Sequence, residues 1–357
     1  MPSSLSDRRD VQSSAGTTLS TRAGRPPASR PWAWVLGMLG AVALLLAIFQ
    51  VFVTTSTGQV TEHMALQAAT ARLETMPPLG ETVLRMLPGV VAVTAVLVFL
   101  VITVWRRRWL ASAIALASFG AANLTTQLLK KVVLVRPDLD NGVPYYTGNS
   151  LPSGHTTFAA AAVVAVVLVV APRWRPLTAT LGALFATAVG AGTFLETWHR
   201  PADMAAAYLV AAFWGLVGGL VILRTGAEWN TRARRTARRL HPGGHPGWDI
   251  ALWVGGLLTT VGGMLCYLLA GGREALDPGA PWTSGWHYLG GLLVSIGPGL
   301  LVFAFLASFL RWESGRPTPG LHGRSGPDSA HVVTGPRAPQ RREPTWDHTS
   351  PGSDQAG

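Results

Sequence analysis

The sequence of 357 residues contains a single cysteine, Cys266. One thiol rules out an internal disulfide framework, a cysteine-rich zinc site and a Cys-x-x-Cys redox pair. Cys266 lies within a long apolar segment, where a free cysteine usually packs as a small hydrophobic side chain. We therefore expect no chemical role for it, and no redox or metal chemistry based on cysteine.

Charged residues are also scarce. They make up 13% of the chain, whereas hydrophobic residues make up 48% and the mean hydropathy is +0.30. Soluble domains usually carry about 25% charged residues, so this composition excludes an ordinary soluble globular protein and favours a membrane protein. The net charge of +11 would suit nucleic acid. The positions of the basic residues fit membrane topology better, so we expect no nucleic-acid partner.

Long apolar runs recur along most of the chain. A helix needs roughly 20 apolar residues to cross a hydrocarbon core of about 30 Å. The segments that suit this are 32–54, 87–105, 109–128, 155–172, 177–197, 202–223, 250–270 and 288–311. They predict an all-α fold, a polytopic membrane helix bundle. The first segment is too long for the apolar part of a signal peptide and no small-residue cleavage site follows it, so we expect a retained signal anchor.

Arginine is concentrated in alternate connections between these segments. The basic clusters are Arg8, Arg9, Arg22, Arg25 and Arg30, then Arg106, Arg107 and Arg108, then Arg173 and Arg175, then Arg224, Arg232, Arg234, Arg235, Arg238 and Arg239. Since basic flanks stay in the cytoplasm, both termini are predicted to be cytoplasmic in a multi-pass protein of the plasma membrane. The connection after the third segment carries Lys130, Lys131 and Arg136 on the opposite side, and such an exception indicates a functional cause.

Pro152-Ser153-Gly154-His155 stands directly before an apolar run. Proline and serine in this position predict the start of a helix. The free N–H groups and partial positive charge of a helix N-terminus bind anions, and Gly154 permits close approach. His155 would stand beside a bound anion as a proton donor. A plain serine cap with an interfacial histidine is the structural alternative.

His199-Arg200-Pro201-Ala202-Asp203 opens the sixth apolar segment. Proline suits a first helical turn, and the i,i+4 spacing allows the Asp203 carboxylate to reach the His199 imidazole. A carboxylate on one ring nitrogen fixes the tautomer and leaves the other nitrogen as a nucleophile. The structural alternative is an aspartate that only complements the helix dipole.

Lys130, Lys131 and Arg136 form a third cluster on the same predicted side. Cations at an anion site neutralise phosphoryl oxygens, although an ordinary juxtamembrane basic patch would show the same residues. In chain order, the three clusters resemble the motifs of the type 2 phosphatidic acid phosphatase (PAP2) superfamily. These are Lys, six residues, Arg-Pro, then Pro-Ser-Gly-His, then Ser-Arg, five residues, His, three residues, Asp. The second motif is complete at 152–155, and so is the His-x3-Asp part at 199–203.

Two positions depart from the family pattern. Arg136 follows Lys130 after five residues instead of six, and the alternative Lys131 is two residues short, so Lys130 is the preferred phosphate-binding lysine. Thr193 stands where the family has the arginine of its third motif. Arg200 is a candidate replacement, with lipid head groups as its alternative contact.

The resemblance implies roles for eight residues. His199 would attack phosphorus to form a phosphohistidine, Asp203 would orient it, and His155 would protonate the leaving oxygen and later activate water. The phosphoryl oxygens would be held by Lys130, Arg136, Ser153, Gly154 and Arg200. No metal or other cofactor is expected, because the cations and the helix N-terminus supply the positive charge.

The resemblance also implies a domain plan. Residues 32–223 would form a PAP2-like core of six transmembrane helices, preceded by a disordered cytoplasmic segment, 1–31. A basic cytoplasmic loop at 224–249, two extra transmembrane helices within 250–311 and a disordered cytoplasmic tail at 312–357 would follow.

The implied activity is that of a membrane lipid phosphate or diphosphate phosphatase, a hydrolase that acts at the extracytoplasmic face on a lipid-linked phosphate. Candidate substrates are isoprenoid diphosphates, such as undecaprenyl diphosphate, and phosphatidate-type lipids. The incomplete first and third motifs leave an alternative, a catalytically weak PAP2-like protein that binds membrane lipids as a scaffold or transporter. The sequence predicts no particular oligomeric state.

Overall fold

The structure is a computed structural model that describes residues 30–144, 149–225, 246–271 and 281–314. Over these ranges the secondary structure is helical and contains no strand. The helices are α1 (Pro31–Ile48), α2 (Ser56–Glu74), α3 (Pro78–Arg106), α4 (Trp109–Leu128), α5 (Gly154–Val169), α6 (Arg175–Leu195), α7 (Pro201–Thr225), α8 (Pro246–Leu269) and α9 (Pro281–Ser314). Short π-helical turns, η1 (Phe49–Val53) and η2 (Leu129–Val133), extend α1 and α4, and a 3-10 turn, η4 (Pro172–Trp174), precedes α6. The all-α prediction is confirmed.

Six of the helical segments in the described ranges are long and apolar enough to cross a membrane. They are 31–53, 109–133, 172–195, 201–225, 247–269 and 285–313. They match six of the eight predicted spans, and the protein is a multi-pass membrane protein. The predicted spans 87–105 and 155–172 are also helical. The first lies within α3, and the second corresponds to the shorter helix α5, Gly154–Val169.

The shortest α-helix in the described ranges, α5, lies inside the bundle. It has 16 residues, about 24 Å at roughly 1.5 Å per residue, which is less than the ~30 Å of a hydrocarbon core. Its neighbours α3, α4, α6 and α7 cover it, and 13 of its residues are buried. Because other helices surround α5, it does not have to match the bilayer by its own length. The predicted end of this span at residue 172 is wrong, since Pro172 begins η4.

Glycines let neighbouring helices approach closely. A Cβ atom at Gly215 of α7 would lie 2.6 Å from Cγ1 of Val164 on α5. One at Gly219 would lie 2.7 Å from the Trp34 ring of α1. Such small residues replace the hydrophobic driving force that is missing between helices in lipid, because they allow tight van der Waals packing.

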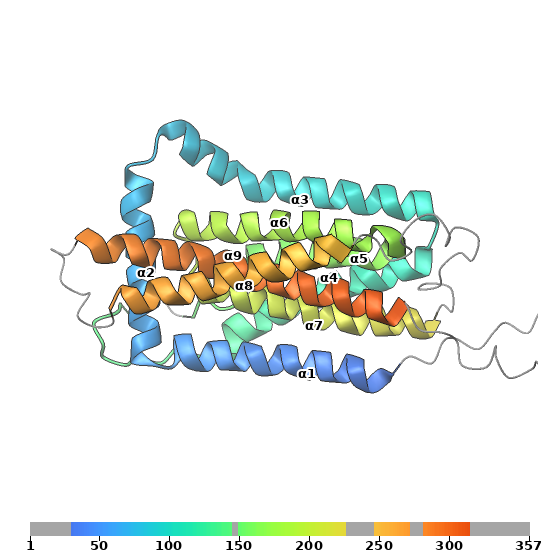
Figure 1. Ribbon diagram of the computed structural model, residues 1–357, viewed down its shortest axis with the longest axis horizontal. Coiled ribbons are helices and arrows are strands. Elements are labelled where there is room, and N and C mark those ends of the chain that lie inside the picture. Colours follow the sequence, from blue (N-terminus) through green and yellow to red (C-terminus); the bar gives the residue numbers. More distant parts are fainter. Residues whose placement is uncertain (1–29, 145–148, 226–245, 272–280, 315–357) are drawn as a thin grey trace, which may run out of the picture. The chain divides into compact units, whose positions relative to one another are not determined.

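The three polar clusters of the sequence meet at one end of the bundle, which we call the site end. Thr126 of α4 and Thr157 of α5 share a hydrogen bond of 3.0 Å there. The Ser153 N–H, just before α5, donates to the carbonyl oxygen of Asp203 in α7 at 3.0 Å. Figure 1 shows α2 running across this end of the long helices.

The opposite end, which we call the arginine end, gathers positive charge. It contains the C-terminus of α3, the N-terminus of α6 and the residues Arg106, Arg108, Arg173 and Arg175. These arginines lie close enough to influence one another electrostatically. The polar clusters and these four arginines therefore lie at opposite ends of the same bundle.

Helix α2 was not predicted from the sequence. Its apolar residues are mainly alanines that do not form one stripe, so no helical periodicity stands out. Thr55 caps it, since its Oγ1 accepts a hydrogen bond from the Gly58 N–H at 3.0 Å. Two polar residues of α2, Gln59 and Glu62, are buried.

The C-terminal helices pack against the rest of the bundle. α9 contacts α2, α6, α7 and α8. The Tyr208 hydroxyl of α7 donates a hydrogen bond to the carbonyl oxygen of Ser295 in α9 at 3.0 Å. A Cβ atom at Gly291 of α9 would lie 2.5 Å from the Phe194 ring of α6. Helix α9 thus packs against α8 and against earlier helices of the bundle.

Three predictions fall largely outside the described residues. They are the disordered segments 1–31 and 312–357 and most of the basic loop 224–249. In the described part, α7 continues to Thr225 and α8 begins at Pro246.

Candidate active site

The loop after α4 is held in place by side chains from distant segments. Asn149 donates to the carbonyl oxygen of Leu134 at 2.9 Å. Gln59 of α2 donates to the carbonyl oxygen of Pro137 at 3.0 Å, next to Arg136, which is buried. The loop that carries the first motif is therefore held by hydrogen bonds from α2 and from the segment before α5.

Ser153 caps α5, as the structural alternative for this tetrapeptide predicted. Its Oγ accepts hydrogen bonds from the Thr156 N–H at 3.4 Å and from the Thr156 hydroxyl at 3.0 Å. The cap uses the Thr156 N–H and does not use those of Gly154 and His155, two residues that line the cavity of the histidine pair. A serine cap and an anion-binding helix N-terminus are compatible here, because they use different N–H groups.

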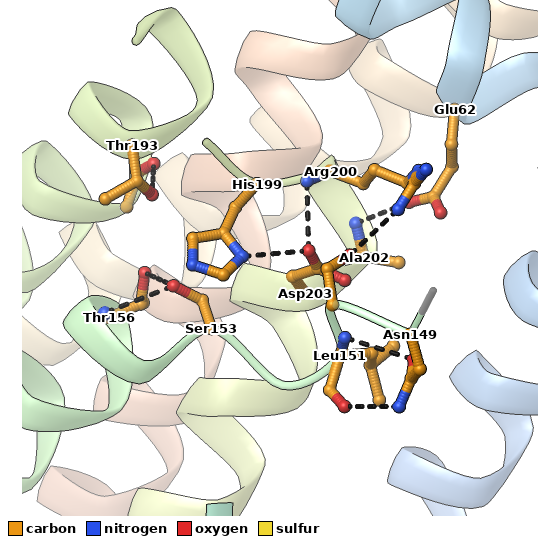
Figure 2. Close-up of polar contacts among 12 residues, drawn as sticks. Glu62, Asn149, Leu151, Ser153, Thr156, Thr193, His199, Arg200, Ala202 and Asp203 are labelled. Atoms are coloured by element: carbon orange, nitrogen blue, oxygen red, sulfur yellow. Dashed lines mark hydrogen bonds and ion pairs between the residues drawn. The ribbon is translucent and has the colours of Figure 1, made fainter. Parts of the chain in front are cut away.

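His199 and Asp203 form the pair that their spacing predicts. Nδ1 of His199 lies 3.1 Å from Oδ2 of Asp203, and both side chains are buried. The same Oδ2 accepts the Arg200 N–H at 3.0 Å, so Asp203 also caps the first turn of α7. With Nδ1 engaged, Nε2 is the ring nitrogen available for attack on an electrophile. Figure 2 shows the imidazole held between α7 and the start of α5.

The two histidines share one cavity. Their ring centroids are 6.3 Å apart at an interplanar angle of 67°. The cavity has a volume of about 550 Å³ and its lining includes both imidazoles. At this spacing a single phosphoryl group can contact both rings. Sequence separation alone, 44 positions between the two histidines, gave no measure of this distance.

Both polar and apolar residues line this cavity. Besides the two histidines, the lining contains Lys130, Gln127, Asn123 and Gly154, together with Gly89, Phe158, Ala159 and Val189. Lys131 is not part of the lining. Neither Gln127 nor Asn123 was singled out from the sequence, because a lone amide in an apolar helix carries no motif.

Arg136, Ser153, Arg200 and Asp203 lie behind the cavity wall, since all four are buried and none belongs to its lining. Nη1 of Arg200 donates to Oγ of Ser150 at 3.0 Å. Figure 2 shows the Arg200 side chain extending away from the His199 imidazole toward Glu62. The structure thus brings the eight predicted residues to one end of the bundle but divides them between the cavity and a buried layer behind it.

Thr193, at the position of the family's missing arginine, has a structural role. Its hydroxyl donates to the carbonyl oxygen of Gly190 at 2.8 Å. Its own carbonyl oxygen accepts the N–H groups of Trp198 and His199 at 3.0 and 3.3 Å. Thr193 therefore holds the turn that carries His199 and sends no side chain to the cavity.

Glu62 of α2 is a buried acid that no sequence motif indicated. Its Oε1 accepts the Ala202 N–H, in the first turn of α7, at 2.7 Å. Burial raises the pKa of Glu62 to about 8, and the nearby Asp203 carboxylate acts in the same direction. The hydrogen bond from Ala202 and the charges of Arg200 and Arg136 oppose that shift.

Arg136 faces the same buried layer. Burial, followed by the like charge of Arg200, lowers the pKa of the Arg136 guanidinium, whereas the carboxylates of Glu62 and Asp203 raise it. Arg136, Arg200 and Glu62 are thus grouped with the Asp203 carboxylate that holds His199. Among the described residues, no group of three or more His, Cys, Asp or Glu side chains has a metal-binding arrangement. The metal-independent site stays a prediction.

Comparison with known proteins identifies this part of the chain. Residues 111–225 match the family model of the PAP2 superfamily, a range that contains all three clusters. The resemblance stated from the motifs is confirmed, and the domain indicates a membrane protein of the phosphatase type. No curated protein and no solved structure matches the chain.

Proposed function

We propose, from the PAP2 superfamily domain at 111–225 and the geometry of its histidines, that this protein hydrolyses phosphate or diphosphate groups on a membrane lipid. The observation that carries the proposal is the arrangement of His199, Asp203 and His155. One imidazole is held by a carboxylate at 3.1 Å, and the other stands 6.3 Å away across the same cavity.

The first step forms a phosphohistidine. Nε2 of His199 attacks phosphorus, the bond from phosphorus to the leaving oxygen breaks, and protonated His155 gives its proton to that oxygen. Asp203 holds the His199 ring in the reactive tautomer and stabilises the charge that develops on it. In the second step neutral His155 takes a proton from water, which attacks phosphorus, and the N–P bond breaks to release inorganic phosphate and restore His199.

Positive charge at the site would stabilise the equatorial oxygens during both steps. Lys130, Gly154 and His155 line the cavity, and the Lys130 ammonium and the first N–H groups of α5 would contact these oxygens directly. Arg136, Ser153 and Arg200 lie in the buried layer. We propose that they hold the phosphoryl group together with Lys130, either by contact or by their charge and dipoles. No metal takes part in this scheme.

The apolar residues in the cavity wall favour a lipid as the substrate. Phe158, Ala159 and Val189 continue from the histidines along α5 and α6, which places apolar surface next to the reacting group. Isoprenoid diphosphates and phosphatidate-type lipids both combine a charged phosphate with such an apolar chain. We therefore propose these two lipid classes as substrates.

The orientation follows from the arginine end. Arg106, Arg108, Arg173 and Arg175 lie opposite the site, and basic flanks are retained in the cytoplasm. We propose that the protein resides in the plasma membrane with cytoplasmic termini and an extracytoplasmic active site. Single cysteines introduced next to α2 would test this, since they should react in intact cells with a thiol reagent that does not cross the membrane.

A phosphate-release assay tests the proposed activity. Purified protein in detergent would be given phosphatidate and isoprenoid diphosphate side by side. We expect His199→Ala to lower turnover by about 10⁴-fold or more, as removal of a nucleophile does in other enzymes. His331→Ala, far along the sequence from the three clusters, serves as the histidine control. Undiminished release in His199→Ala would reject the mechanism.

One observation favours a second function, a lipid-binding protein of low activity. Thr193 replaces the family's arginine and bonds only its own helix and the following turn. A protein of this kind would bind orthovanadate, a phosphate mimic, without releasing phosphate from any lipid. Vanadate-sensitive phosphate release by the wild type would reject this second function.

A further inference from the structure

Helix α2 joins the segments that carry the first and third motifs. Gln59 donates to the carbonyl oxygens of Val53 at 2.8 Å and Pro137 at 3.0 Å. Its own side-chain oxygen accepts the Asn141 amide at 3.1 Å. One turn further along α2, Glu62 reaches the first turn of α7. The helix thus spans from the end of α1 across the first-motif loop to the third motif.

Glu62 belongs to this network because its side chain is buried and accepts a hydrogen bond. Its side chain is 1% exposed, and Oε1 accepts the Ala202 N–H at 2.7 Å. That N–H belongs to a helix first turn, where four N–H groups have no partner within the helix. A neighbouring one, at Arg200, is taken by Asp203. Two carboxylates from different parts of the chain therefore complete the cap of α7.

The second carboxylate oxygen of Glu62 also lies in a charged environment. Oε2 is buried and accepts no hydrogen bond from the described residues. Arg200 and Arg136 are near enough to act on Glu62 electrostatically, and so is Asp203. A buried acid without full hydrogen bonding is costly, so its presence beside a catalytic pair needs a reason.

Other ionisable groups interact electrostatically with this region. They are His63 on α2 itself, Asp203 on α7, Tyr267 on α8, and Arg136 and Arg200 in the adjoining loops. Glu196 at the end of α6 and His287 on α9 are also buried. Burial, followed by the positive charges of Arg200 and Arg136, lowers the pKa of His63, which disfavours a third cation. Glu62 and Asp203 are the carboxylates that act on these two arginines.

We propose that Glu62 is a positioning residue of the phosphatase site, which holds the first turn of α7 by a hydrogen bond and, when ionised, offsets the charge of Arg136 and Arg200. The proposal rests on the phosphatase function proposed above. Glu62 touches no substrate in this arrangement. It acts through Ala202 on the segment that carries His199 and Asp203, and through the arginines on the charge offered to the phosphoryl group.

The two contributions depend differently on ionisation. The carboxyl oxygen accepts the Ala202 N–H whether Glu62 is neutral or charged. Its negative charge, in contrast, is present only above its pKa of about 8 and then offsets the arginines. As pH rises through this value, attraction of an anionic substrate weakens, so KM should rise while the cap persists.

Three variants separate these contributions. Glu62→Gln keeps an oxygen that accepts the Ala202 N–H but cannot ionise. Glu62→Ala removes both the acceptor and the charge. Glu74→Gln, at the exposed end of the same helix, is the matched control. Each would be assayed for kcat and KM from pH 6.5 to 9.5, and hydrogen exchange would be followed on peptides that contain residues 199–204.

At pH 7 we expect Glu62→Ala to lose about tenfold in kcat with faster exchange at the start of α7, because the cap is lost. Glu62→Gln should keep kcat within about threefold of the wild type and show normal exchange. Between pH 7 and 9.5 the KM of the wild type and of Glu74→Gln should rise by up to about tenfold more than that of Glu62→Gln.

Two results would overturn the proposal. One is a loss in Glu62→Gln as large as in Glu62→Ala. The other is a KM–pH curve of Glu62→Gln that superimposes on the wild-type curve. If Glu62→Ala does not fold, the comparison of Glu62→Gln with the wild type still decides through the second criterion. A wild type that releases no phosphate from any lipid would instead reject the proposed function, which keeps the two failures distinct.

Discussion

The two ends of the helix bundle both contain buried arginine, but they use it differently. At the site end, Arg136 and Arg200 are grouped with the carboxylates of Glu62 and Asp203. At the arginine end, Arg175 is buried near further arginines. The like charges at the arginine end are expected, because basic residues next to membrane spans are retained in the cytoplasm. The opposite charges at the site end come from distant parts of the sequence, so they meet only when the helices pack together.

The largest expected difference between the two ends is in kcat when a buried aspartate is replaced at each end. Asp203→Asn at the site end should lower kcat by about 10³- to 10⁴-fold, because the neutral amide no longer fixes the His199 tautomer or stabilises its positive form. Asp249 at the arginine end is bonded to Nη2 of Arg311 at 2.7 Å. Asp249→Asn should lower the thermal midpoint but leave kcat per folded molecule within about twofold. Equal losses of kcat in both variants would abolish the distinction between the ends.

Neutralising one arginine at each end gives the next largest contrast. Arg136→Gln should reduce kcat/KM by about 10- to 100-fold, since a buried cation near the phosphoryl site is lost. Arg173→Gln, at an exposed position of the arginine end, should change kcat/KM by less than about twofold. Steady-state assays on both purified variants measure this. Comparable effects would mean that Arg136 contributes only to folding or topology.

A smaller effect is expected from glycines that differ in the space around them. A Cβ atom at Gly58 would press against the Val51 carbonyl oxygen and lie 2.6 Å from Cα of Phe52. Gly58→Ala should therefore displace the start of α2 and reduce kcat by about threefold to tenfold. At Gly40 nothing lies within 4 Å of such an atom, so Gly40→Ala should be neutral. If Gly58→Ala were as active as Gly40→Ala, the position of α2 would not matter to the site.

The smallest effect is a pH dependence of stability at the site end. Burial raises the pKa of Glu62 from 4.5 to about 8, so folding favours its protonated form. That stabilisation is complete below pH 4.5 and is lost as pH rises through about 8. The thermal midpoint of the wild type should thus fall across this window relative to Glu62→Gln. Parallel midpoint curves for the two proteins would show that Glu62 does not titrate in this range.

Local patterns in the sequence were sufficient for much of the fold. Apolar runs of about 20 residues marked helices because the bilayer requires them. The run at 155–172 was an exception in its length, since α5 ends at Val169 and is enclosed by other helices. Helix α2 escaped prediction because its buried face consists largely of Ala, Gly, Gln and Glu, which form no apolar stripe.

Within the site, short-range contacts were predictable. The bond between His199 and Asp203 spans one helical turn, and the Ser153 cap spans three residues, so residue spacing is enough to place them. Glu62 could not be found in this way. Its partner Ala202 lies 140 positions away, and no motif marks a lone acid on a polar helix.

The sequence by itself determined that this protein is a helical membrane protein, and that His155 and the His199–Asp203 pair each stand at a helix start, because those features depend on neighbours within one or two turns. Only the tertiary structure decided that the two imidazoles line one cavity, that Lys130 rather than Lys131 joins them, and that Arg200 extends toward Glu62. Those outcomes depend on how α2, α4, α5 and α7 pack together, and the spacing of residues along the chain does not specify distances between helices.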